Sequence, residues 1–164
     1  MKSLKVISVL LVCIFFSAAV AICAQEQNTI NILEQLSQEL ERGKVVTPRE
    51  WRAIKNPIRN MLNQGATRED LRNMLEDLSR KDLRGRDLEN TVNAVNDLVN
   101  KGENPKEAGN IVSQAAHAAQ AQGLKGKDLA AKVHEAVGQR KQELEKTQKM
   151  KQEGKGRGVN KGKK

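Results

Sequence analysis

The feature that most constrains this fold is a recurring junction of glycine, any residue and a helix-capping residue. The junction separates stretches in which apolar residues recur at spacings of three and four. Glycine suits the left-handed position that ends a helix, and Thr, Asp or Asn can accept the free amides that begin the next helix. The junctions are Gly65-Ala66-Thr67, Gly85-Arg86-Asp87, Gly102-Glu103-Asn104 and Gly126-Lys127-Asp128.

Two helix starts are predicted more strongly than the others. Thr47-Pro48-Arg49-Glu50 is a capping box, and Asn104-Pro105-Lys106-Glu107 resembles one, because each places Pro at the first helical position and Glu at the third. We expect a kink or split at Asn56-Pro57, since proline lacks the amide that a helix uses. The apolar spacing predicts helices at about residues 28–42, 48–64, 67–82, 87–101, 104–122 and from 127 onward.

An internal repeat organises these helices. The segment that begins Asn63-Gln64-Gly65 aligns with the one that begins Asn100-Lys101-Gly102, at an offset of 37 residues. Leu83-Arg84-Gly85-Arg86-Asp87-Leu88 aligns with Leu124-Lys125-Gly126-Lys127-Asp128-Leu129, at an offset of 41. Repeated helical hairpins bury their apolar faces against one another. The predicted fold is therefore all-α, a small bundle or short superhelix of about six helices with related hairpins at about 63–99 and 100–138.

The first 24 residues have the three parts of a secretory signal. Lys2 and Lys5 precede an apolar run at 6–20, and small residues such as Ala21 and Ala24 follow it. We expect cleavage after Ala24, which gives a periplasmic or secreted product. The alternatives are cleavage after Ala21, a lipid anchor on Cys23 and an uncleaved membrane tether. Cleavage after Ala24 removes both cysteines, so the mature chain would lack disulfides and thiol chemistry.

Positive charge is concentrated at the C-terminal end. Residues 25–138 carry 17 basic and 17 acidic residues, whereas residues 139–164 carry 10 basic and 3 acidic residues. We assign 25–150 to a helical domain and 151–164 to a disordered Gly/Lys-rich tail, which lacks the apolar surface to order itself. Mobile cations attract any polyanion. The predicted polyanion-binding residues are Lys146, Lys149, Lys151, Lys155, Arg157, Lys161, Lys163 and Lys164.

The residues that usually carry chemistry are sparse. His117 and His134 lie off the apolar stripes of their helices, so we expect them to be exposed and not to face each other. Trp51, the only tryptophan, is expected in the core of its helix. Asp87 and Asp128 are interpreted as helix caps. We therefore expect no catalytic site, no cofactor and no metal.

Together these features predict an exported small helical binding or scaffold protein that is not an enzyme. Its basic tail would contact anionic envelope polymers or lipid headgroups, or make nonspecific contact with nucleic acid, while an unidentified protein binds the body. A tail that only keeps the protein soluble is the other interpretation of these charges. The alternative function is a structural envelope protein that self-associates as a homo-oligomer through the alanine-rich helix at about 104–122.

Overall fold

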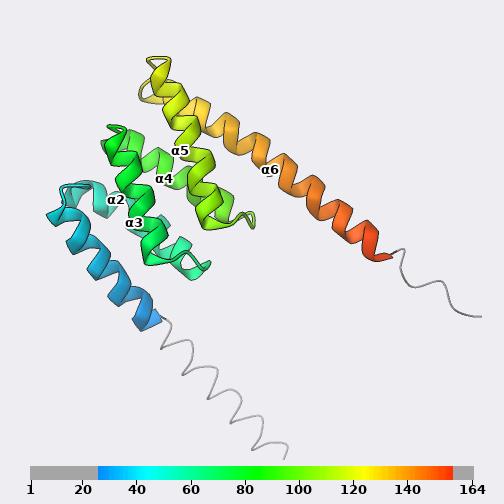
Figure 1. The fold of residues 1–164 in the computed structure, drawn as a ribbon, viewed down its shortest axis with the longest axis horizontal. Helices are drawn as coiled ribbons and strands as arrows, with labels where there is room; N and C mark the ends of the chain where they lie inside the picture. The colour runs from blue at the N-terminus through cyan, green and yellow to red at the C-terminus, as the bar shows by residue number, and fades with distance from the viewer. Residues whose placement is uncertain (1–25, 157–164) are drawn as a thin grey trace, which may run out of the picture.

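The computed structural model describes residues 26–156, with side chains to residue 150, and these residues form helices joined by short turns (Figure 1). No strand occurs among them, which confirms the all-α prediction. The signal-peptide prediction lies outside the described residues. The elements are an N-terminal helix at 26–42, α2 (Pro48–Asn63), α3 (Arg68–Arg80), α4 (Gly85–Val99), α5 (Pro105–Ala121) and α6 (Lys127–Gly156).

The helices form two layers, and helices that follow one another in the chain alternate between them. In one layer α4 packs between α2 and α6, and in the other α3 packs against α5. The N-terminal helix joins the second layer, because its Glu39 pairs with Arg68 and Arg72 of α3. The chain is thus a stack of three helical hairpins. The sequence repeat predicted the last two, and the N-terminal helix with α2 takes the place of another.

One apolar core runs through both layers. Leu36 of the N-terminal helix, Ile54 of α2, Leu75 of α3 and Leu88 of α4 are fully buried. Each such side chain stabilises the fold by about 1.5–3 kcal/mol relative to exposure. Trp51 is 6% exposed, as predicted. Toward the C-terminus the core side chains become smaller, and α5 contributes Ala108, Val112, Ala116 and Ala119.

The helix starts at Thr47 and Thr67 are capped as the sequence indicates. The hydroxyl of each threonine accepts the amide of the residue three positions later, and that residue's carboxylate accepts the threonine amide. The residues that complete these capping boxes are Glu50 and Asp70. At Asn104 the side chain accepts the Lys106 amide, and the carboxylate that accepts the Asn104 amide comes from Glu103.

The helices before α6 all end in the same Schellman geometry. A residue with positive φ is followed by one whose amide donates to the carbonyl five residues earlier, which satisfies a carbonyl that the helix leaves free. Glycine occupies the positive-φ position at Gly65, whereas Lys44 and Asp82 occupy it in two other turns. The amide-to-carbonyl bonds run from Val45 to Leu40, Ala66 to Met61, Leu83 to Leu78, Glu103 to Leu98 and Leu124 to Ala119.

Two of the predicted junctions differ from their interpretation. Gly85 and Gly126 do not end the preceding helix but stand at the start of the next one, with φ of 55° and 58°. Asp87 and Asp128 consequently lie inside the first turns of α4 and α6, so they are not N-cap residues. The N-cap of α4 is Arg84, which makes no side-chain capping bond.

Carboxylates in the first turns of α2 and α4 join one hairpin to the next. Glu50, in the first turn of α2, accepts the Gly85 amide at 2.6 Å, and Asp87, in the first turn of α4, accepts the Gly126 amide at 3.3 Å. Glu50 is 8% exposed. Burial raises its pKa, but hydrogen bonds from Gly85 and Thr47 outweigh burial, so the pKa lies below its usual value. The carboxylate is therefore ionised at neutral pH.

Two further features differ from the predicted boundaries. α2 continues through Pro57 as one helix, since the buried Ile54 and Ile58 hold both sides of the proline against the core. α6 continues to Gly156, so the first residues of the predicted tail have helical backbone, and the remainder of that tail lies outside the described residues. Within residues 26–156, no helix has the length and apolar content needed to span a membrane.

The Schellman geometry predicts opposite effects for two glycine substitutions. Gly65 has a φ of 95° and Gly138 lies within α6, and an added Cβ would meet no atom within 4 Å at either position. Gly65→Ala should lower the free energy of unfolding by about 1–2 kcal/mol, because an L side chain is strained at this φ. Gly138→Ala should raise it by about 0.5–1 kcal/mol. Urea unfolding measures both, and shifts of the same sign would contradict this geometry.

Candidate anion-binding site

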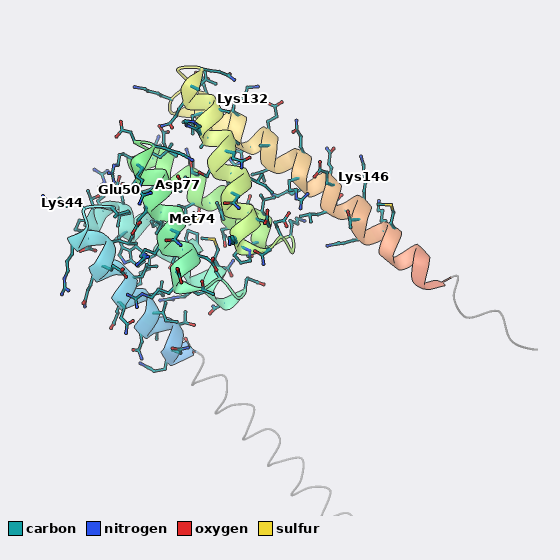
Figure 2. The ribbon with its side chains drawn as sticks, viewed as in Figure 1. Lys44, Glu50, Met74, Asp77, Lys132 and Lys146 are labelled. Atoms are coloured by element: carbon teal, nitrogen blue, oxygen red, sulfur yellow. The ribbon has the colours of Figure 1, made fainter. Side chains whose placement is uncertain are left out.

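The predicted polyanion-binding residues divide between α6 and the chain beyond it. Lys146 and Lys149 are exposed on the part of α6 that extends away from the hairpin stack (Figures 1 and 2). Neither makes an ion pair with the described residues. Lys151 and Lys155 belong to the α6 backbone, but their side chains are not described. Arg157, Lys161, Lys163 and Lys164 lie outside the described residues.

Two basic residues at the beginning of the charged region fasten α6 to the body. The Arg140 guanidinium pairs with Glu103 in the turn between α4 and α5, and with Glu143 at 2.9 Å. Lys141 pairs with Asp97 of α4 at 3.4 Å. Hydrogen bonds to Glu103 and Glu143 raise the pKa of Arg140 above its usual value. These two cations are therefore engaged within the protein, and the candidate anion contacts begin after them.

The Glu103 carboxylate explains why that turn departs from the others. The residue after the positive-φ position is apolar in the other Schellman turns, whereas here it is a glutamate with only 8% of its surface exposed. A charge at such a position is costly unless it is paired. Arg140 supplies the pairing from α6. Sequence reasoning missed this pair because its partners are 37 residues apart.

A second polar cluster joins α3 to α5. The Asp77 carboxylate accepts hydrogen bonds from the Ser113 hydroxyl and from the Lys81 ammonium, the latter at 2.8 Å, and Lys81 also donates to Ser113 at 2.9 Å. Burial raises the pKa of Asp77, but the hydrogen bonds from Lys81 and Ser113 together outweigh burial, so the pKa lies below its usual range. An ionised carboxylate that is already bonded to an ammonium is a weak base. The cluster therefore links α3 to α5.

A hollow of about 400 Å³ lies beside this cluster, between α3 and α5. Gly109 permits the close approach of the two helices there, since an added Cβ would stand 3.6 Å from the Met74 sulfur. The hollow is lined mostly by polar groups, and two of its carboxylates are already bonded, Asp70 to Thr67 and Asp77 to Lys81 and Ser113. Asp70 thus caps α3, and Asp77 links α3 to α5 through Ser113.

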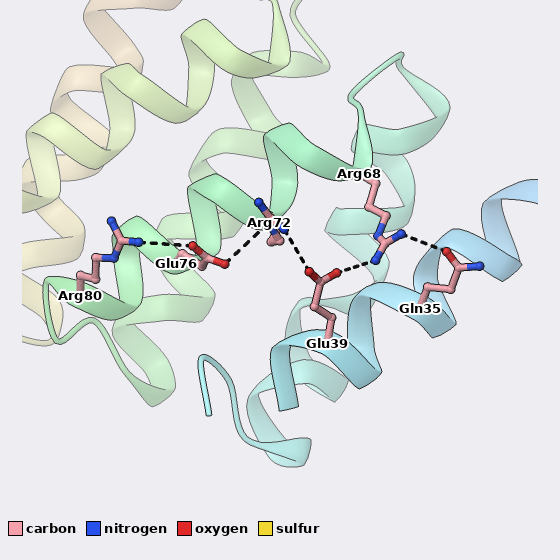
Figure 3. Close-up of polar contacts among 6 residues, drawn as sticks. All are labelled: Gln35, Glu39, Arg68, Arg72, Glu76 and Arg80. Carbon is pink, nitrogen blue, oxygen red and sulfur yellow. Dashed lines mark hydrogen bonds and ion pairs between the residues drawn. The ribbon is translucent and has the colours of Figure 1, made fainter. Parts of the chain in front are cut away.

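An ion-pair ladder joins the N-terminal helix to α3 (Figure 3). Glu39 accepts from Arg68 at 2.6 Å and from Arg72 at 3.1 Å, and Glu76 pairs with both Arg72 and Arg80. The hydrogen bonds from Arg68 and Arg72 lower the pKa of Glu39. Carboxylates and guanidinium groups alternate along this face. Three arginines share two glutamates, so each guanidinium is bonded to an acid and the ladder offers a net charge of only +1 to a partner.

The remaining sequence predictions concern the histidines and the alanine-rich helix. His117 and His134 are both exposed, as expected. No group of three or more metal-ligating side chains occurs in the described part of the chain. In α5, Ala108, Ala116 and Ala119 are buried against neighbouring helices of the same chain.

Comparison with protein-family models, curated proteins and solved structures finds no match to this chain.

The Arg140 pair predicts an asymmetric response to substitution. Arg140→Gln should lower the free energy of unfolding by about 1–3 kcal/mol, because it leaves the Glu103 carboxylate buried without its partner. Glu103→Gln combined with Arg140→Gln should cost less than the sum of the single changes, since neither charge is then orphaned. Lys132→Gln, which breaks an exposed pair with Glu135, is the control and should cost no more than about 0.5 kcal/mol. Equal losses from Arg140→Gln and Lys132→Gln in urea unfolding would contradict the anchoring role.

Proposed function

We propose that this protein is an exported helical binding or scaffold protein whose basic C-terminal region contacts anionic components of the cell envelope. The observation that carries the proposal is the division of the cations along α6. Arg140 and Lys141 are paired with the body, whereas Lys146 and Lys149 are exposed and unpaired among the described residues, beyond the packed part of the helix. The anchored part of α6 would hold the following cations away from the hairpin stack.

The alternation of charge along α6 limits what its helical part can do alone. Between residues 142 and 156 the chain has four lysines and three glutamates, and the following eight residues have four basic residues and no acid. Attraction to a polyanion grows with the number of phosphates or other anions that the protein neutralises. We therefore propose that the helical cations act together with Arg157, Lys161, Lys163 and Lys164.

Substitution tests this proposal better than truncation, because truncation after Gln139 would also remove the Arg140 anchor. Replacement of all eight predicted residues, from Lys146 to Lys164, by Gln should weaken binding to phosphatidylglycerol vesicles or heparin by about tenfold or more at low salt. Replacement of the seven lysines among them by Arg keeps the charge and serves as the matched control. Binding is measured over a salt series. Unchanged affinity in the Gln variant would remove the basis for the tail's role.

The alternative proposal is self-association through α5. Ala108, Ala116 and Ala119 are buried within the chain, so among the alanines of that helix only Ala118 and Ala121 are exposed. A seam between two copies would need a larger face than these two methyl groups supply. Sedimentation that shows only monomer at high protein concentration would exclude it.

A further inference from the structure

The outer face of α2 carries a row of cations that has no part in the proposed role of α6. Arg49, Arg52 and Arg59 are exposed and Lys55 is partly exposed. At 100° per residue the four side chains fall within an arc of roughly 120°, and at 1.5 Å per residue they extend over about 15 Å. We name these four residues the α2 basic stripe.

The stripe has no internal counter-charge. None of its four residues forms an ion pair with the described residues, and the single bond recorded for them joins Arg52 to its own helix at the Pro48 carbonyl. The only acid in α2 is Glu50, which is buried and bonded to Thr47 and Gly85. The four cations therefore remain without an ion pair among the described residues.

This arrangement weakens the helix that carries it. Arg49 and Arg52, Arg52 and Lys55, and Lys55 and Arg59 are neighbours at spacings of three or four, and like charges at such spacings cost about 0.2–0.5 kcal/mol per pair. On α3 the same spacing instead pairs Arg72 with Glu76, and Glu76 with Arg80. A charge pattern selected only for stability would alternate as α3 does, so the stripe is better explained by an anionic ligand.

The surroundings of the stripe restrict the shape of that ligand. Toward the N-terminal helix, the exposed Glu34 shares a shallow hollow with Lys55. On the other side α4, which packs against α2, exposes the neutral Asn93 and Asp97, whose charge is paired with Lys141. The unpaired positive charge of α2 is thus flanked by the acid Glu34 on one side and by neutral or paired groups on the other. A broad anionic plane such as a membrane would bring negative charge against Glu34 and would meet no unpaired cation on the Asn93 side, whereas a linear polyanion can lie along α2 alone.

The side chains that lie beside the cations restrict the chemistry of the ligand. The exposed side chains of Asn56 and Asn63 lie on the same side of α2, and amides can bond the hydroxyl groups of sugars as both donors and acceptors. Three of the four cations are arginines, whose planar forks match carboxylate, sulfate and phosphate oxygens. The only tryptophan is buried and the chain has no tyrosine, so the base stacking that strengthens single-stranded nucleic-acid binding has no platform here.

We infer that the α2 basic stripe binds a linear anionic polysaccharide along the helix axis. Arg49, Arg52, Lys55 and Arg59 would pair with its acidic groups, and Asn56 would bond its hydroxyl groups. This inference does not rest on the proposed role of α6, because the two sets of cations belong to different helices and can be changed separately.

Binding of a fluorescent heparin oligosaccharide to the full chain tests the inference. Arg52→Gln with Arg59→Gln should weaken binding by about tenfold or more near 0.1 M salt, and should lower the slope of log affinity against log salt by about two. Lys125→Gln with Lys127→Gln removes the same charge from exposed, unpaired positions on another hairpin turn. That control should change affinity less than about threefold, a loss that long-range attraction alone accounts for. Circular dichroism checks that both variants keep the wild-type helix content.

Two results would overturn the inference. Equal losses from the two double variants would show that heparin senses only net charge. Oligo-dT or phosphatidylglycerol vesicles that bind as tightly as heparin, and lose that binding through Arg52→Gln with Arg59→Gln, would assign the stripe to nucleic acid or membrane instead. Heparin binding that depends on the stripe and survives the α6 substitutions would support the inference even if the proposed role of α6 failed.

Discussion

Contact between successive hairpins is the constraint on which this structure depends. The core is supplied mainly by leucine and valine with several alanines, and it forms one continuous cluster through the described helices. Repeated helical hairpins generally bury their apolar faces against one another. Carboxylates in the first turns of α2 and α4 complete the contact by accepting the amides of Gly85 and Gly126. Each bond fixes where the next even-numbered helix begins. The layer of α2, α4 and α6 follows from this repetition.

The same stacking decides which charges reach solvent. Acids and bases alternate where helices face each other, as in the ladder through Glu39 and Arg72, so those charges are used internally. Arg140 and Lys141 likewise pair with acids of the body and attach α6 to it. Among the cations left unmatched are the row on the outer face of α2 and those on α6 beyond its anchors. Both proposals about ligands therefore arise from where the packing leaves charge unpaired.

The sequence predicted the helices well because their signals are local. Thr47, Gly65 and Thr67 work through residues within one or two turns, so their roles could be read directly. The prediction that Gly85 ends α3 was wrong, because Gly85 begins α4 and its amide donates to a carboxylate 35 residues earlier. The Arg140–Glu103 pair has the same long-range character. The α2 basic stripe was visible in the spacing but was hidden by the zero net charge of residues 25–138.

Native-state hydrogen exchange at the amides of Gly85 and Gly126 would decide whether carboxylates join the hairpins as described. Glycine amides in exposed turns exchange quickly, whereas amides bonded within a packed core open only with larger unfolding events. The hairpin stack predicts that both amides are protected to a degree comparable with the interior of α4. Exchange of both at the rate of exposed turns would contradict the inter-hairpin bonds and, with them, the basis for the stacked arrangement.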